Sequence, residues 1–225
     1  MLSLLGPGER ARAARYRSRL SGQLFVASRA AQRILAGRYL GRDPASVMID
    51  RRCQHCGDDQ HGRPRVAATD AERGGLDFSV THTGDLLLLA HVSHGHVGID
   101  AEDADRRPKT GGLASFVLTP AEADLLAAAP ETGRDQAFCR LWVRKEALLK
   151  LTGHGIAVRL RTIDVTMDEI PAGSAEGIPG WPVSPVELTD LSLGIPEYVA
   201  AIATTLPARR VTVRRAAPFL TAPSR

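Results

Sequence analysis

Residues 142–150 read Trp142-Val143-Arg144-Lys145-Glu146-Ala147-Leu148-Leu149-Lys150, and the interpretation of the whole chain starts from this stretch. It lies within a pattern of apolar residues at helical spacing, from about residue 135 to about residue 152, which predicts a helix with one buried stripe. Lys145 falls near the middle of that stripe, where a charged group needs a partner. Glu146 and Lys150, one turn apart, flank the same stripe. Taken alone, this pattern favours an ordinary Glu–Lys pair along a helix.

A second stretch, residues 97–102, alternates in polarity as a β-strand does and reads Val97-Gly98-Ile99-Asp100-Ala101-Glu102. The apolar residues are expected on the core face, and Asp100 and Glu102 together on the other face. Two carboxylates at this spacing have Cα atoms about 6.5–7 Å apart, so their oxygens can converge on one divalent ion. A pair of exposed acids at the end of a strand is the alternative that these residues alone leave open.

Size and composition describe a soluble globular protein. The 225 residues suit one large domain or two lobes, and 44% of them are hydrophobic while 24% are charged. No apolar run approaches the roughly 20 residues that a membrane-spanning helix needs. Three cysteines, an odd number, argue against a disulfide framework. We therefore expect a cytoplasmic protein without a membrane partner.

The charge of the chain suggests an anionic partner. The formal net charge is +4, and arginines are frequent near both ends of the sequence. Aromatic residues make up only 4% and are not interleaved with these arginines, so a platform for stacked nucleic-acid bases is not expected. Binding to nucleic acid is kept as a minor hypothesis.

The loop near residue 55 contains half of a possible zinc site. Cys53 and Cys56 form a CxxC pair, and His61 follows. A structural zinc ion normally has four protein ligands, and no second CxxC or HxxxH motif follows. Two free cysteines on a loop are therefore the favoured interpretation.

The remaining pattern alternates helices and strands. A capping box with proline at its first helical position, Thr119-Pro120-Ala121-Glu122, predicts a helix start and gives Glu122 a structural role. Residues 106–112 are the best boundary between two lobes. Other helices are expected near residues 9–19 and 25–40, and strands near 47–51, 78–81, 86–92, 158–167, 185–188, 198–204 and 210–213.

Three motifs appear together and in a fixed order. The first is Phe78-Ser79-Val80-Thr81-His82-Thr83-Gly84, the second is the 97–102 strand, and the third runs from Phe116 to Gly155 and contains the 142–150 helix with Gly153. This ordered set resembles the 4′-phosphopantetheinyl transferases of the two-lobed, surfactin-synthetase-activating type. Thr81 stands where that family has serine, Ala101 where it has valine or isoleucine, and Arg63 where it has lysine. None of these departures removes a group that the chemistry requires.

The resemblance implies an α+β fold built from two similar α/β lobes related by a pseudo-two-fold axis. The active site would lie in the cleft between them. Residues 1–112 would form the N-terminal lobe, with coenzyme A binding and the Asp100/Glu102 pair, and residues 113–225 the C-terminal lobe, with the 142–150 helix.

The resemblance also implies an activity. Such enzymes transfer the phosphopantetheine arm of coenzyme A to a serine of an apo acyl- or peptidyl-carrier protein domain and release adenosine 3′,5′-bisphosphate. Asp100, Glu102 and Glu146 would hold Mg²⁺, Glu146 would also accept the serine proton, and Lys150 would stabilise the leaving phosphate. The residues that would contact coenzyme A are Arg29, Arg63, Thr81, His82, Thr83, Asp100, Lys145 and Lys150, with Arg12 as a further candidate.

Several alternatives accompany this interpretation. A transferase dedicated to fatty-acid carrier proteins is usually about half this length and trimeric, so the length favours the two-lobed type, expected to be a monomer serving polyketide or nonribosomal peptide biosynthesis. A non-catalytic protein of the same fold that binds coenzyme A or a carrier would be expected to lack an acidic ligand or Lys150, and all are present. A basic nucleic-acid-binding module would show affinity for DNA that falls steeply with salt.

Overall fold

The protein is described by a computed structural model. It covers residues 1–53, 56–58, 62–67, 75–105, 112–155, 158–174, 178, 181–205 and 211–216. The cysteine loop is thus only partly described, and the proposed boundary at residues 106–112 lies almost wholly outside the described residues.

The predicted central helix is present as α6, Arg134–Thr152. It ends at Gly153, which adopts a left-handed conformation (φ 77°) and whose amide donates to Leu149 O at 2.8 Å. Its buried stripe includes Leu141, Leu148 and Leu149, each at most 1% exposed. The apolar periodicity therefore predicted both the helix and its buried face.

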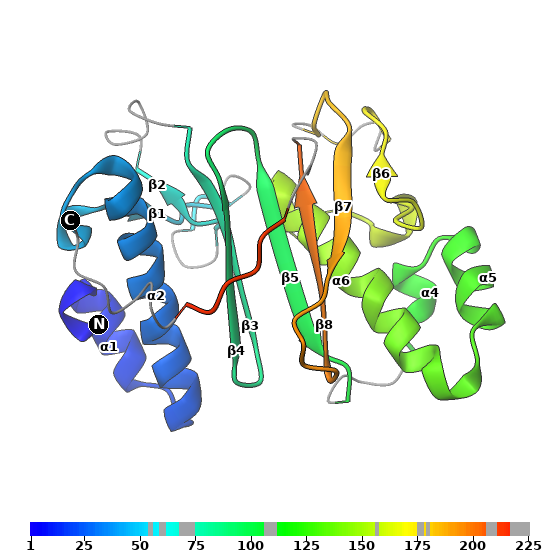
Figure 1. The fold of residues 1–225 in the computed structure, drawn as a ribbon, viewed down its shortest axis with the longest axis horizontal. Coiled ribbons are helices and arrows are strands. Elements are labelled where there is room, and N and C mark those ends of the chain that lie inside the picture. The colour runs from blue at the N-terminus through cyan, green and yellow to red at the C-terminus, as the bar shows by residue number, and fades with distance from the viewer. Residues whose placement is uncertain are drawn as a thin grey trace.

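Helix α6 packs against one face of a four-stranded sheet (Figure 1). All strands of this sheet are antiparallel, in the order β5-β8-β7-β6. Ile99 on β5 pairs with Ile202 on β8. The strands are β5 (Val97–Asp103), β6 (Glu169–Ile170), β7 (Val186–Leu191) and β8 (Tyr198–Thr204).

Gly98 allows α6 to lie directly on β5. A Cβ atom built at this position would lie 1.9 Å from Ala147 O and 2.5 Å from Leu151 N, both on α6. No side chain fits in that space. The glycine of the second motif thus sets the distance between the strand and the helix.

The N-terminal part contains two helices, a small two-stranded sheet and a hairpin. The long helix α2 begins after Ser18, whose hydroxyl accepts from Ser21 N, and ends at Gly41 (φ 65°). The hairpin of β3 and β4 packs on β5, and its sheet is separate from the four-stranded one. The elements are α1 (Pro7–Ala14), α2 (Arg19–Leu40), β1 (Ile49–Asp50), β2 (Arg65–Val66), β3 (Asp77–Thr83) and β4 (Leu86–Val92), with 3-10 helices η1 (Leu2–Leu4) and η2 (Pro44–Ser46).

Two helices cover the other end of α6. The predicted capping box opens α5: Thr119 Oγ1 accepts from Glu122 N, and Glu122 Oε2 accepts from Thr119 N at 2.8 Å. The elements here are α4 (Ala114–Val117), α5 (Pro120–Ala128), η3 (Glu131–Gly133) and η5 (Leu160–Thr162). The strand expected near residues 158–167 is wrong, because most of this segment is irregular around η5. The strand expected at 210–213 is also wrong where it is described, from Val211, and residue 210 lies outside the described part.

The α+β class is confirmed. Division into lobes at residue 112, and a pseudo-two-fold axis, stay predictions. Strand β5 precedes residue 112 in sequence but is hydrogen-bonded to β8, so the strand with the acidic pair shares a sheet with the C-terminal strands. Residues 211–216, red in Figure 1, run back across the β3–β4 hairpin, and Val211 packs against the buried cluster of Ala90, Val97, Ile99 and Ile202. None of the described helices is long and apolar enough to span a bilayer.

Candidate active site

The three sequence motifs meet where β3 lies beside β5. The two strands run in the same direction, and side chains of β3, rather than a backbone ladder, join them. Asp77 Oδ2 accepts from Val97 N at 2.8 Å, and Ser79 Oγ accepts from Ile99 N at 3.1 Å. Farther along, Thr81 Oγ1 donates to Asp100 Oδ1 at 2.9 Å, and Thr83 Oγ1 donates to Glu102 Oε2 at 3.3 Å. We call this set of four side-chain contacts the β3–β5 seam.

Asp100 is the centre of the site. It is 4% exposed, and its Oδ1 accepts from Lys150 Nζ at 2.6 Å as well as from Thr81. Burial raises the pKa of Asp100 and the charge of Glu102 raises it further, whereas Lys150 and Thr81 lower it. Its second oxygen, Oδ2, is buried and has no hydrogen-bond partner among the residues that the structure describes. An ionised carboxylate held this way presents one oxygen to a cation.

Glu102 and Glu146 complete the predicted acidic set. Glu102 is half-buried and lies two residues beyond Asp100 on the same face of β5. Glu146 is half-buried on α6, one turn before Lys150. Across the described ranges, no three acidic, histidine or cysteine side chains already form a group that could hold a metal ion. The magnesium site stays a prediction. The orphaned Asp100 Oδ2 and the all-oxygen donors fit Mg²⁺ chemically.

The structure gives Lys145 a role within the core. Its side chain is 1% exposed, and its ammonium forms an ion pair with Glu122 Oε2 at 2.8 Å. It also donates to the carbonyl oxygens of Leu160 (2.8 Å) and Ile163. All three N–H groups are thus used inside the core, and contact of Lys145 with the phosphates of coenzyme A stays a prediction. Burial lowers the pKa of Lys145, and the Glu122 carboxylate opposes that effect.

Arg63 is also held by the protein itself. Its guanidinium is paired with Asp77 and donates to Leu151 O and Val97 O, both at 2.9 Å. These contacts join β3, β5 and the C-terminal turn of α6. Arg63 therefore has a structural role, and its contact with coenzyme A stays a prediction.

Arg29 lies in a group of arginines that we call the arginine cluster: Arg12, Arg29, Arg33 and Arg51. Glu9 faces three of them, at 3.7 Å from Arg29 Nε, 2.8 Å from Arg33 Nη2 and 3.6 Å from Arg51 Nη1.

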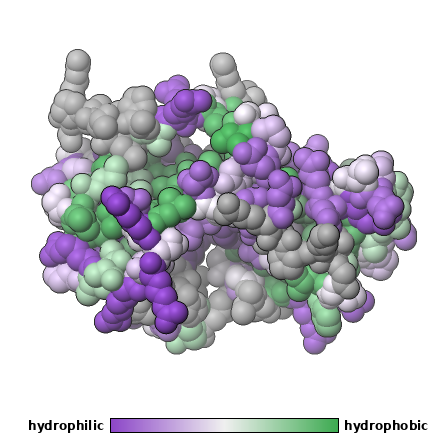
Figure 2. All heavy atoms as spheres, turned by 90° about the horizontal axis from the view of Figure 1, so that it is seen from below, coloured by the Kyte–Doolittle hydropathy of each residue, from purple (hydrophilic) through white to green (hydrophobic). Residues whose placement is uncertain are grey.

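The ring of Phe25 lies between two members of the arginine cluster. Arg29 Cζ is 4.9 Å and Arg12 Cζ 5.6 Å from the ring centroid. Burial lowers the pKa of Arg29, and Arg12 and Arg33 lower it further while Glu9 raises it. On the face seen in Figure 2, strongly hydrophilic residues stand among hydrophobic ones on the left, the side that carries α1 and α2. In the described contacts one carboxylate, that of Glu9, faces three guanidinium groups, which leaves excess positive charge and suits an anionic ligand.

The arginine cluster was only partly predicted. The sequence pointed to Arg29 and Arg12, and it missed Glu9 and Arg51. Arg33 follows Arg29 by one helical turn on α2, and that i,i+4 spacing was a usable signal. Arg51 lies beyond β1 and reaches the cluster through tertiary structure, where it also donates to Gln32 Oε1 at 2.6 Å.

His82 lies apart from its two threonine neighbours. It is exposed, whereas Thr81 is 6% exposed and Thr83 is half-buried. Alternation along β3 places the His82 side chain on the opposite face from the seam. The two threonines donate to the two carboxylates, and their contact with coenzyme A stays a prediction.

Among the described residues, neither Cys53 nor Cys56 forms a disulfide. His61, the third member of the possible zinc site, lies outside the described residues. Whether this loop binds zinc therefore stays a question that the sequence raises.

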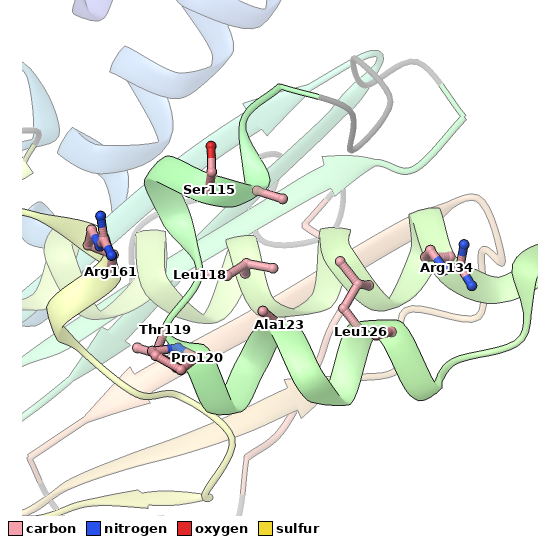
Figure 3. Close-up of a pocket in the computed structure, with 10 residues that line it drawn as sticks. Ser115, Leu118, Thr119, Pro120, Ala123, Leu126, Arg134 and Arg161 are labelled. Carbon is pink, nitrogen blue, oxygen red and sulfur yellow. The ribbon is translucent and has the colours of Figure 1, made fainter.

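A separate cavity of about 670 Å³ opens between α4, α5, the start of α6 and η5 (Figure 3). Its walls are mostly apolar, with Arg134 and Arg161 at its ends. The lining residues are Ala114, Ser115, Leu118, Thr119, Pro120, Ala123, Leu126, Ala127, Arg134 and Arg161. It contains none of the predicted site residues.

Comparison with known proteins supports the motif-based interpretation. A family model described as the 4′-phosphopantetheinyl transferase superfamily matches residues 96–203, which contain Asp100, Glu102, Glu146 and Lys150. The 4′-phosphopantetheinyl transferase HetI of Nostoc sp. is 31% identical over 181 residues, covering 80% of this chain and 73% of that protein. A putative 4′-phosphopantetheinyl transferase of Synechocystis sp. is 32% identical over 161 residues, covering 72% of this chain and 62% of that protein.

More distant matches agree in family. A 4′-phosphopantetheinyl transferase of Bacillus subtilis is 28% identical over 138 residues, covering 61% of this chain and 55% of that protein. The crystal structure of Thermotoga maritima holo-[acyl-carrier-protein] synthase aligns with a TM-score of 0.34 and 15% identity, over 48% of this chain and 61% of that one, too low to carry an argument. The sequence matches decide the assignment: this chain is an enzyme and belongs to the 4′-phosphopantetheinyl transferase superfamily.

Proposed function

We propose that this enzyme transfers the 4′-phosphopantetheine arm of coenzyme A to a serine of an apo acyl- or peptidyl-carrier domain in a magnesium-dependent reaction. The observation that carries the proposal is the 2.6 Å contact between Lys150 Nζ and Asp100 Oδ1. It brings the helix motif and the strand motif, 50 residues apart in sequence, to one point. The presence of the third motif at that point, through Thr81, supports it.

In the proposed reaction, the carrier serine Oγ forms a bond to the phosphorus that bears the pantetheine arm. The bond from that phosphorus to the oxygen of the adenosine-side phosphate breaks, and adenosine 3′,5′-bisphosphate leaves with the electron pair. Glu146 accepts the serine proton, directly or through water. Asp100, Glu102 and Glu146 would hold Mg²⁺, which when bound neutralises charge on the pyrophosphate.

Lys150 has a second task beyond its contact with Asp100. Its side chain is 31% exposed, so the ammonium is open to solvent on one side. One N–H donates to Asp100, and an ammonium carries three. The others are directed to the leaving phosphate in this proposal, where they stabilise the negative charge that develops.

The arginine cluster supports a site for the 3′-phosphate of coenzyme A. Arg29 Nε and Arg51 Nε are buried donors without a hydrogen-bond partner among the described residues. Arg29, with His82 and Thr83, is proposed to bind the adenosine end of the cofactor. Lys145 and Arg63 are not included in this proposal, because their charged groups are already paired within the fold, with Glu122 and Asp77.

We further propose that the enzyme is of the surfactin-synthetase-activating subtype and that its carrier is acidic. It would serve polyketide or nonribosomal peptide synthases, as a monomer located in the cytoplasm. The basic net charge of +4 supports the acidic carrier and the polyanionic cofactor.

Intact-mass analysis tests the proposal directly. An apo carrier domain incubated with the enzyme, coenzyme A and Mg²⁺ should gain about 340 Da, the mass of the arm, and chelator should prevent the gain because phosphoryl-group transfer of this kind depends on the metal. Asp100→Ala and Glu146→Gln should abolish the gain while the proteins stay folded. Full activity of either variant would contradict the metal and base assignments. Absence of any gain with several unrelated carriers, together with tight binding of coenzyme A, would favour a non-catalytic binding protein.

A further inference from the structure

The hydrogen bonds to Asp100 are distributed unevenly between its two oxygens. Thr81 Oγ1 and Lys150 Nζ both donate to Oδ1, at 2.9 and 2.6 Å. Within the described part of the chain, Oδ2 accepts no hydrogen bond, although it is buried. Rotation of a carboxylate about its last torsion is soft, so nothing in Asp100 itself maintains this asymmetry. The two donors on Oδ1 must do so.

Thr81 is the more rigid of these two donors. It lies within the β3 ladder, paired with Leu88 on β4, and is 6% exposed. Its branched side chain has few rotamers, so the hydroxyl has a fixed direction towards β5. Lys150 reaches the same oxygen with a long, partly exposed chain that has many rotamers. The fixed donor sets the orientation of the carboxylate, and the mobile one adds charge.

We propose that Thr81 is a positioning residue for the metal site: its hydroxyl holds Asp100 Oδ1, so that Oδ2 is kept available to the divalent ion. This inference rests on the proposed function, because it takes Asp100 to be a metal ligand. In this proposal the Thr81 hydroxyl binds the Asp100 carboxylate rather than coenzyme A. Hydrogen-bonded partners of metal ligands typically contribute about 10-fold to 100-fold in metal affinity, so the effect should be measurable.

The seam offers a matched control. Ser79 also lies on β3, faces β5 and is buried, but its hydroxyl accepts from the backbone amide of Ile99 and does not contact a carboxylate. Thr83 contacts Glu102 at the longer distance of 3.3 Å and is half-buried. Loss of a seam hydroxyl at Ser79 therefore perturbs the packing of β3 on β5 and leaves the acidic pair untouched.

The test measures metal binding without any carrier protein. Mn²⁺, used in place of Mg²⁺, is titrated into the full-length enzyme with coenzyme A, and free Mn²⁺ is followed by electron paramagnetic resonance. Thr81→Val should raise the Kd for Mn²⁺ about 10-fold or more, and Thr81→Ser, which restores a hydroxyl, should recover most of the affinity. Ser79→Ala should leave the Kd unchanged while it lowers the denaturation midpoint to a similar extent as Thr81→Val.

Two results would overturn the inference, and they are distinguishable. If wild-type enzyme loses Mn²⁺ affinity on Asp100→Ala but Thr81→Val binds as wild type does, or no more weakly than Ser79→Ala, the positioning role is wrong and the metal site stands. If Asp100→Ala binds Mn²⁺ as wild type does, the metal assignment fails, and the role of Thr81 fails with it.

Discussion

At the scale of single residues, two lysines on one helix have separate tasks. Lys145 and Lys150 both belong to the motif on α6, and both are charged groups near an apolar stripe. Lys145 pairs with Glu122, which is completely buried and whose Oε1 also accepts from Val165 N at 2.9 Å. Lys150 pairs with Asp100 at the site. The first lysine ties α6 to the capping box of α5, and the second serves the chemistry.

Replacement of each lysine by methionine should separate these tasks. Lys145→Met leaves the Glu122 carboxylate buried without its counter-charge and should lower the free energy of unfolding by about 3–5 kcal/mol. Its transfer rate per folded molecule should stay close to that of wild type. Lys150→Met should reduce the transfer rate by about 100-fold or more, because charge stabilisation at the leaving phosphate is lost. Urea unfolding and a carrier-modification assay measure the two effects, and a near-normal rate for Lys150→Met would reject its assigned role.

At the scale of elements, the contact between α6 and β5 depends on the absence of a side chain at Gly98. Gly98 faces the backbone of α6 at Ala147 and Leu151, so the strand and helix approach more closely than any side chain would permit. The contact between Lys150 and Asp100 spans this same junction. Any increase in the distance between β5 and α6 should therefore lower both the free energy of unfolding and the rate of transfer.

Gly98→Ala should show this coupling. The added methyl group overlaps backbone atoms, which cannot move as a side-chain end can, so we expect a loss of about 1–3 kcal/mol in unfolding free energy, or more. Transfer activity should fall as well, because Lys150 moves relative to Asp100. Gly8→Ala in α1 is the control, since a Cβ there meets nothing within 4 Å. Retention of wild-type stability by Gly98→Ala would show that α6 and β5 can separate without cost.

At the scale of the whole molecule, the N-terminal hairpin and the four-stranded sheet are joined by side chains. The seam provides part of that joint, and Arg63 provides another, since it contacts Asp77, Val97 and Leu151 at once. Tyr198 adds a third contact from β8, donating to Asp85 Oδ1 in the β3–β4 turn at 2.7 Å. The acidic site thus lies where side-chain hydrogen bonds hold the hairpin against the four-stranded sheet.

Arg63 and Arg29 should therefore behave differently when replaced. Arg63→Met leaves Asp77 with fewer donors and should lower the free energy of unfolding by about 1–3 kcal/mol. The Kd for coenzyme A should change little in that variant. Arg29→Met should raise that Kd about 10-fold, because hydrogen bonds to charged groups contribute about 1.5–3 kcal/mol. Calorimetric titration of coenzyme A against both variants measures the contrast. Weakened binding on Arg63→Met, with unchanged stability, would restore Arg63 to the cofactor site.

Sequence patterns predicted the local parts of this structure and missed those that depend on tertiary contacts. The period of apolar residues gave α6, alternation gave β5, and the capping box gave the start of α5. The partner of Lys145 was missed, because a lysine in an apolar stripe implies a buried partner without saying which one. The 158–167 strand was wrong: Val158, Ile163 and Val165 enter the core from an irregular segment. Two of its carbonyl oxygens, those of Leu160 and Ile163, accept from Lys145. The partners of Arg63 could not be inferred from neighbouring residues at all.

The seam has a consequence for exchange of parts between related enzymes. A backbone ladder joins two strands whatever their side chains are. The seam, in contrast, depends on side chains at alternate positions of β3: Asp77, Ser79, Thr81 and Thr83. The fit between the hairpin and the four-stranded sheet therefore depends on which residues occupy these positions. A chimera that takes residues 1–92 from a relative should assemble well only if the donor brings side chains of the same kinds to these four places. Recombination at this point should therefore give a well-assembled protein only when these four positions carry compatible residues.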